Sequence, residues 1–119
     1  MPFARAGGQI DPASALAALV EDRRRGRPLP VVAARFHNGV AAMVAEACAA
    51  LRDRSGLSMV ALSGGVWQNM LLLARAVARL EALGFMVLVH RQVPANDGGL
   101  ALGQAAVAAV RWPFAPERT

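Results

Sequence analysis

The sequence predicts an α/β domain with the element order ααβαβα and two parallel strands. The stretch from residue 68 to 83 carries apolar residues at three- and four-residue steps, the stretch from about 31 to 54 carries a broad apolar stripe, and two short runs are continuously apolar. Such runs are typical of strands covered on both faces, and the helical stretch between them makes a right-handed parallel crossover. Two strands leave sheet edges open, so we expect further strands from a parent chain or from a second copy of this chain.

The first half of the chain is predicted to form two helices. Asp11-Pro12 offers a capping side chain and a first-turn proline, and Gly26 followed by Pro28 ends this first helix. An apolar stripe then predicts a second helix from about residue 31 to 54, which ends at a glycine.

The second half alternates strands and helices. The predicted elements are a strand over 58–63, a helix over 68–83, a turn at Gly84, a strand over 85–89 and a helix from about 100 to 111. We interpret residues 11–111 as the folded part, with an N-terminal tail over 1–10 and a C-terminal tail over 112–119.

Composition limits the class of protein. The length of 119 residues fits one small domain or a piece of a larger one. The chain is 55% hydrophobic with a mean hydropathy of +0.37, so we expect some of its apolar surface to pack against another chain or domain. Apolar runs are too short to span a membrane, and the N-terminus lacks the apolar core of a signal peptide, so we expect a cytoplasmic protein and no membrane partner. Cys48 is the one cysteine, and its alanine-rich surroundings favour a small buried residue over a nucleophile.

The net charge of +5 does not by itself indicate nucleic-acid binding. The arginine cluster over 23–27 ends a predicted helix and has no aromatic residues among its members. We interpret it as a solvated helix end, where cations also complement the helix dipole, and expect no nucleic-acid partner.

The first candidate site is the turn Ser63-Gly64-Gly65, which lies between a strand and a helix. Glycine accepts positive φ or close approach of another group, and the helix that follows offers unpaired amides with partial positive charge. Such a turn suits a phosphate. The alternative is a tight strand-to-helix connection that binds nothing.

The second candidate site is Asn96-Asp97-Gly98-Gly99, which precedes the last helix. Parallel strands place both glycine-rich turns at the same sheet edge, where open α/β sheets bind ligands. Asp97 suits a hard cation, although Asp97 or Asn96 capping the helix is the alternative. His90 follows a strand and can reach the same crevice, whereas His37 is interpreted as a partly buried, hydrogen-bonded histidine. Two histidines and one cysteine are too few for a zinc site made by this chain alone.

Three stretches, in this order and at these intervals, carry a family resemblance. They are VVAARFHNGVA, VALSGGVWQNMLLL and HRQVPANDGGLALGQAAVA, and the first is preceded by DPASALAALVEDRRRGRPLP. Together they resemble the C-terminal end of the HypF carbamoyltransferases, maturation factors of nickel-iron hydrogenases, over roughly residues 11–111. The pairing of SGGVxxN with PxNDGGLxLGQ is specific, whereas either half alone is weak.

The resemblance implies part of an actin-like ATPase (ASKHA, Kae1-like) lobe that lacks the preceding β-meander. In that family the lobe helps transfer a carbamoyl group from carbamoyl-adenylate to a C-terminal cysteine of the HypE partner. The implied ligands are ATP or carbamoyl-adenylate and a divalent metal (Mg, Fe or Zn) completed by ligands outside this chain. The residues implied to meet the nucleotide or to shape its loop are Ser63, Gly64, Gly65, Asn69, Gly98 and Gly99. Asp97 is implied to be one metal ligand.

The chain also departs from the family. The remaining metal ligands there are two histidines of an upstream motif, which this sequence lacks, as it lacks the further domains of the family. The isolated chain is therefore expected to be inactive, whether it is an excised fragment, a truncated product or a subunit of a split enzyme. Its partners would be a HypE-like protein and either the remainder of the carbamoyltransferase or a second copy.

Two other functions remain open. A non-catalytic interaction module would fit the high hydrophobicity and the missing strands, although a scaffold needs neither Asn69 nor a carboxylate at residue 97. A sugar kinase or chaperone ATPase of the same superfold is the third reading, against which NDGGLALGQ argues.

Overall fold

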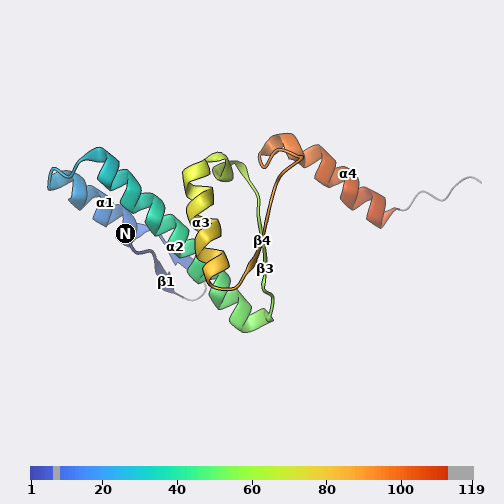
Figure 1. Ribbon diagram of the computed structural model, residues 1–119, viewed down its shortest axis with the longest axis horizontal. Coiled ribbons are helices and arrows are strands. Elements are labelled where there is room, and N and C mark those ends of the chain that lie inside the picture. The colour runs from blue at the N-terminus through green and yellow to red at the C-terminus, as the bar shows by residue number, and fades with distance from the viewer. Residues whose placement is uncertain (7–8, 113–119) are drawn as a thin grey trace, which may run out of the picture.

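The computed structural model describes residues 1–6 and 9–112, and it has the expected mixed helices and strands with a parallel strand pair (Figure 1). In chain order the elements are β1 (Ala4–Ala6), β2 (Gln9–Asp11), α1 (Ala13–Arg24), α2 (Leu29–Ser55), β3 (Met59–Leu62), the 3₁₀ turn η1 (Gly65–Gln68), α3 (Met70–Ala82), β4 (Met86–Val89), the 3₁₀ turn η2 (Asp97–Gly99) and α4 (Leu100–Arg111). The four helices and two apolar strands lie where the sequence predicts them, with ends shifted by one or two residues.

The β3–β4 pair and α3 form the centre of the molecule. The strands are parallel, in a register that runs from Met59 opposite Met86 to Leu62 opposite Val89. One face of this pair packs on α2 and α3 because alternate strand residues point toward them. The buried core consists of Ala41, Ala45, Leu62, Leu72, Ala76, Leu80 and Phe85.

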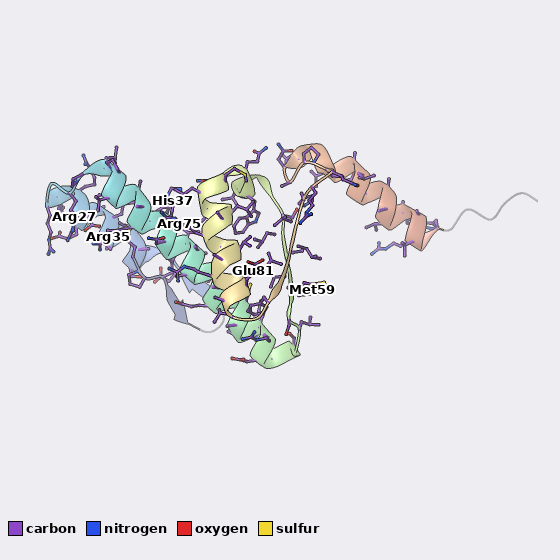
Figure 2. All side chains as sticks on the ribbon, viewed as in Figure 1. Arg27, Arg35, His37, Met59, Arg75 and Glu81 are labelled. Atoms are coloured by element: carbon purple, nitrogen blue, oxygen red, sulfur yellow. The ribbon has the colours of Figure 1, made fainter. Side chains whose placement is uncertain are left out.

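Polar contacts fix α2 against α3 and against the connection between α3 and β4. Arg75 of α3 donates from Nη1 to the backbone oxygen of Ala34 at 3.1 Å and also bonds the Asn38 side chain on α2 (Figure 2). Near the other end of α2, Arg52 donates to the backbone oxygen of Leu83 at 2.7 Å and lies 4.3 Å from the centroid of the Phe85 ring. These contacts hold α3 in place, and with it the residues that lead into the start of β4.

A buried carboxylate joins α1 to α2. The Asp22 side chain is 6% exposed, and its two oxygens lie 2.8 Å from Arg27 Nε and 2.9 Å from Arg35 Nε. Neither N–H group points along a hydrogen-bond direction, so these are ion pairs rather than charge-assisted hydrogen bonds. Part of the arginine cluster thus serves packing, whereas Arg25 makes only an exposed pair with Glu21.

Residues 1–6 and 9–10 have more structure than the predicted tail. Residues 4–6 and 9–11 pair as antiparallel strands, which the sequence analysis did not predict because three-residue strands are too short to show a period. Gly39 is buried against the backbone of Met1, and a Cβ at Gly39 would lie 2.3 Å from the Met1 oxygen. The Phe3 ring lies 6.5 Å from the Phe36 ring. Of the expected C-terminal tail, residues 113–119 lie outside the described residues.

The second face of the β3–β4 pair is open. Met59 and Met86 are directly opposite each other and are 58% and 60% exposed, and Figure 2 shows Met59 on the side of the strands away from α3. Helix α4 stands apart from the other helices, and all its residues are exposed (Figure 1). Across residues 1–6 and 9–112, no helix combines the length and the apolar character needed to cross a bilayer.

Candidate functional site

The two glycine-rich turns meet at the carboxyl ends of β3 and β4. The backbone N–H of Gly64 donates to the backbone oxygen of Ala95 at 2.8 Å, and a Cβ built on Gly65 would lie 3.8 Å from Asn96 Cβ. Because the strands are parallel and in register, the residues that follow them also meet, and Ser63 Oγ lies 2.8 Å from His90 Nε2. The structure therefore brings the two predicted turns into one place.

Gly64 has a backbone conformation that favours glycine. Its φ is +105° and its ψ is 157°, and other residues rarely adopt such a positive φ. The chain leaves β3 through this residue and begins η1 at Gly65, so the sharp change of direction after the strand rests on Gly64.

The Asn96–Gly99 turn is shaped by one side chain and one close approach. Asn96 Oδ1 accepts from the backbone N–H of Gly98 at 3.0 Å, so Asn96 rather than Asp97 makes the cap. At Gly99 a Cβ would lie 2.5 Å from the backbone oxygen of Pro94, which leaves no room for a side chain. These contacts leave the Asp97 carboxylate free of the capping role.

A cavity of about 640 Å³ lies between the meeting turns and α4. Ser63, Gly64, His90 and Asp97 line it from the strand ends and loops, and α4 contributes mainly apolar residues with the amide of Gln104. Its volume is in the range of small-molecule sites, and few polar groups on an apolar wall are typical of such sites.

Asp97 is the one predicted metal ligand, and its side chain is exposed at this cavity. Within the described part of the chain its carboxylate has no hydrogen-bond or ion-pair partner, and no three His, Cys, Asp or Glu side chains gather into a metal-binding group. A carboxylate in this position fits a hard divalent cation as a single ligand, and the described residues add no group of further carboxylate, imidazole or thiolate ligands to it.

Asn69 and His37 are linked. Asn69 Oδ1 accepts from the backbone N–H of Leu72 at 3.1 Å and so caps α3, and Asn69 Nδ2 lies 2.8 Å from His37 Nε2. The other ring nitrogen of His37 lies 2.8 Å from the backbone oxygen of Ala33. His37 is half-buried and hydrogen-bonded, as the sequence analysis interpreted it, and Asn69 lies outside the lining of the cavity.

Cys48 is half-buried beside the core. Burial raises the pKa of its thiol above the ordinary value, because a thiolate is poorly solvated there. The thiol therefore stays protonated, which agrees with the interpretation that Cys48 is not a nucleophile.

Sequence reasoning did not find the two histidine contacts. His37 is 32 residues from Asn69, and His90 is 27 residues from Ser63. The parallel strand prediction contained a signal for the second pair, since Ser63 ends one predicted strand and His90 follows the other at the same edge of the sheet. No comparable sequence signal links His37 to Asn69.

A family model described as carbamoyltransferase, Kae1-like domain, second subdomain, matches residues 1–104. Among curated proteins, HypF2 of Cupriavidus necator is 37% identical over 108 residues, which is 91% of this chain and 13% of that protein. HypF of Rhodobacter capsulatus is 39% identical over 105 residues, which is 88% of this chain and 13% of that protein. The chain therefore spans about an eighth of the length of these two relatives.

A solved structure has the same fold. It is the crystal structure of full-length HypF in the phosphate- and nucleotide-bound form, and it superposes with a TM-score of 0.89 at 33% identity. The match covers 97% of this chain and 16% of that one. On the family match over residues 1–104 and on this likeness in sequence and fold, the chain belongs to the HypF carbamoyltransferase family.

Proposed function

We propose that this chain is the C-terminal nucleotide-binding part of a carbamoyltransferase, within an actin-like (ASKHA) ATPase lobe. In this proposal it helps transfer a carbamoyl group from carbamoyl-adenylate to the C-terminal cysteine of a HypE-like partner during nickel-iron hydrogenase maturation. The chain is inactive alone and acts together with the remainder of the enzyme, in the cytoplasm.

One observation carries the proposal: the two glycine-rich turns join through the Gly64–Ala95 hydrogen bond at the edge of a cavity. The turn after β3 leads into helical backbone, whose N–H groups have a partial positive charge that favours phosphate oxygens. The apolar wall of α4 suits a nucleoside. Asn69 lies outside the cavity lining, at the start of α3, and its amide is proposed to meet a polar group of the nucleotide that extends beyond the cavity.

Asp97 is proposed to hold a divalent cation together with ligands outside the chain. When bound, such a cation would offset negative charge on the phosphate and on the transferring group. Asp97 itself contributes a carboxylate at the cavity whose oxygens are not used by the loop, because Asn96 makes the cap. Gly98 and Gly99 shape the loop that presents this carboxylate.

The test is a hybrid enzyme in which this chain replaces the matching segment of Cupriavidus necator HypF2. We expect the hybrid to carbamoylate its HypE partner in the presence of ATP and carbamoyl phosphate. Asp97→Asn should reduce transfer at least a hundredfold while leaving the fold intact, since one metal ligand is lost. Asp53→Asn is the matched control, because Asp53 is an exposed α2 residue outside the cavity.

Nucleotide binding by the chain itself is measured separately, by calorimetric titration with ATP and magnesium. Gly65→Val should remove binding by occupying the approach of the phosphate, without loss of helix content. Full transfer activity in the Asp97→Asn hybrid would contradict the metal assignment, whereas ATP affinity unchanged in Gly65→Val would contradict the phosphate assignment.

A second candidate function is a non-catalytic interaction fragment of the same half-fold. The observation that favours it is the exposed apolar face of β3–β4, together with the exposed apolar residues of α4. An inactive hybrid combined with stable self-association of the chain would favour this candidate over the transferase.

A further inference from the structure

Both histidines of the chain bond to the segment of residues 63–69, which runs from the candidate phosphate-binding turn through η1 to the cap of α3, one at each end of the segment. His90, which follows β4, bonds through Nε2 to Ser63, the residue that opens the turn. His37, from the first third of α2, bonds through Nε2 to Asn69, the residue that ends the segment, and its side chain lies between α2 and α3 (Figure 2). Two elements distant in sequence thus hold the polar side chains at the two ends of the segment 63–69.

The protonation of the His37 ring follows from its partners. Nδ1 lies 2.8 Å from the backbone oxygen of Ala33, and a carbonyl oxygen can only accept, so Nδ1 carries the proton. In the neutral ring Nε2 then accepts, and Asn69 Nδ2 donates to it. The bond from the Leu72 N–H to Asn69 Oδ1 demands the same orientation of the amide.

This arrangement leaves one N–H group of the Asn69 side chain available to a ligand. The Asn69 amide has two N–H bonds, of which His37 takes one, while its oxygen is used by the cap of α3. The second N–H has no partner within residues 1–6 and 9–112. A ligand at Asn69 therefore meets a hydrogen-bond donor. The bond to His37 prevents a flip of the amide that would exchange the positions of its oxygen and nitrogen.

The hydrogen bond between Ser63 and His90 can run in either direction, and the direction decides whether Ser63 offers a ligand a donor or an acceptor. His90 Nδ1 has no partner among the residues described, so the contacts of His90 allow either neutral tautomer. If the Ser63 hydroxyl donates its hydrogen bond to His90 Nε2, Ser63 Oγ offers only lone pairs to a ligand in the cavity. If Nε2–H donates to Ser63 Oγ, the hydroxyl proton is free for an acceptor in the cavity.

We propose that His37 and His90 are positioning residues that make Asn69 and Ser63 present protons to a phosphate-bearing nucleotide. The inference rests on the proposed nucleotide site, because phosphate oxygens accept hydrogen bonds and thereby select the Nε2–H tautomer of His90. Each histidine acts through its partner, so its effect on binding should vanish when that partner is removed.

The first test is nitrogen-15 NMR of the histidine rings in the 119-residue chain, with and without ATP and magnesium. We expect His37 to be the Nδ1–H tautomer in both states, and His90 to be the Nε2–H tautomer once ATP is bound. A merely structural role would not change the His90 tautomer on titration with ATP. An Nε2–H tautomer at His37, or an Nδ1–H tautomer at His90 in the ATP complex, would overturn the inference.

The second test is a double-mutant cycle on ATP affinity. His90→Phe and His37→Phe should each weaken binding about five- to tenfold, the loss expected for one hydrogen bond. Glutamine at either position should restore much of the affinity, because its amide can donate or accept. In a Ser63→Ala background, His90→Phe should cause no further loss of ATP affinity. In an Asn69→Ala background, the same should hold for His37→Phe. Glu81→Gln, near the far end of α3, is the control with unchanged affinity.

The outcomes separate the inference from the proposed function. If the wild-type chain binds ATP and both phenylalanine variants bind equally well, the positioning role is wrong and the nucleotide site stands. Additive losses in the double mutants would also overturn it, because the histidines would then act independently of Ser63 and Asn69. If ATP leaves the resonances of residues 63–69 unchanged in the wild-type chain, the proposed nucleotide site falls and the inference falls with it.

Discussion

Gly64 and Gly99 both stand at the candidate site, but different physical requirements select glycine at each. Gly64 has the φ of +105° that side-chain-bearing residues rarely adopt, while a Cβ there would meet nothing within 4 Å. Gly99 has an ordinary φ of −89°, but its Cβ would lie 2.5 Å from the Pro94 oxygen. Alanine is therefore strained at Gly64 and obstructed at Gly99.

Gly99→Ala should open the contact between the two turns. The Pro94 backbone must move to admit the methyl group, and the adjacent Ala95 oxygen accepts the hydrogen bond from Gly64. We expect amide exchange of the Gly64 N–H to become at least about tenfold faster, as measured by NMR. Gly103→Ala is the control four residues further on, since its Cβ meets nothing within 4 Å. Equal exchange rates in both variants would show that Gly99 can be replaced without moving the loop.

At the level of residues, sequence reasoning located the turns better than it located their partners. Glycines and an adjacent carboxylate are visible as a local pattern, so the segments 63–65 and 96–99 were found. The sequence did not predict that Asn69 both caps α3 and bonds to a histidine, because the His37 contact depends on how α2 packs against α3. The roles of these residues toward a nucleotide or metal stay predictions.

At the scale of elements, α3 depends on the side chain at its start. Asn69 supplies the oxygen that accepts from Leu72, and among the described residues no other side chain is found to cap this helix. Asn69→Ala should therefore lower the free energy of unfolding by about 1 kcal/mol, as measured by urea denaturation. The neighbouring Gln68→Ala is the control, with a change within about 0.5 kcal/mol. If the two variants were equally stable, the cap would contribute nothing to α3.

The joint between α1 and α2 depends on a buried charge. Asp22→Asn leaves the two arginines without their counter-charge, and we expect a loss of about 2 kcal/mol in the free energy of unfolding. The loss stays below that of a fully buried pair because Arg27 and Arg35 are 41% and 42% exposed. Glu21→Gln removes only the exposed pair with Arg25 and should change stability by about 0.5 kcal/mol or less. A stability loss in Glu21→Gln as large as in Asp22→Asn would contradict this assignment.

The parallel strands, α2 and α3 could be predicted because each carries its own periodic or continuous apolar pattern, whereas α1 was located by the residues that begin and end it. Apolar steps located α3, and continuous apolar runs located β3 and β4. The β1–β2 pair could not be predicted, because its strands have three residues each. The wide separation of α4 from the other helices was also not predictable. Apolar residues on a helix indicate that it packs against something, but they do not identify the element or partner that it packs against.

On the scale of the whole molecule, the chain has covered only part of its apolar surface. The inner face of β3–β4 meets α2 and α3, while the outer face exposes Met59, Met86 and Leu88. Matching the chain to 16% of a solved HypF chain at a TM-score of 0.89 means that this half-covered sheet has the form it has within a much larger protein. The open face is thus a surface that the isolated chain exposes to water.

Such a face should make the isolated chain self-associate, because an exposed apolar patch lowers its free energy by contact with a copy. Leu88→Lys places a charge on the open face, where Leu88 is 46% exposed, and should reduce the association constant about tenfold or more without a large change in stability. Val87→Lys is the matched comparison one residue earlier, since Val87 packs against the core. It should instead lower the free energy of unfolding by about 2 kcal/mol or more. Sedimentation equilibrium and urea denaturation distinguish the two effects. A wild-type chain that stays monomeric, or a Leu88→Lys variant that associates as strongly as the wild type, would show that association does not proceed through the open face of β3–β4.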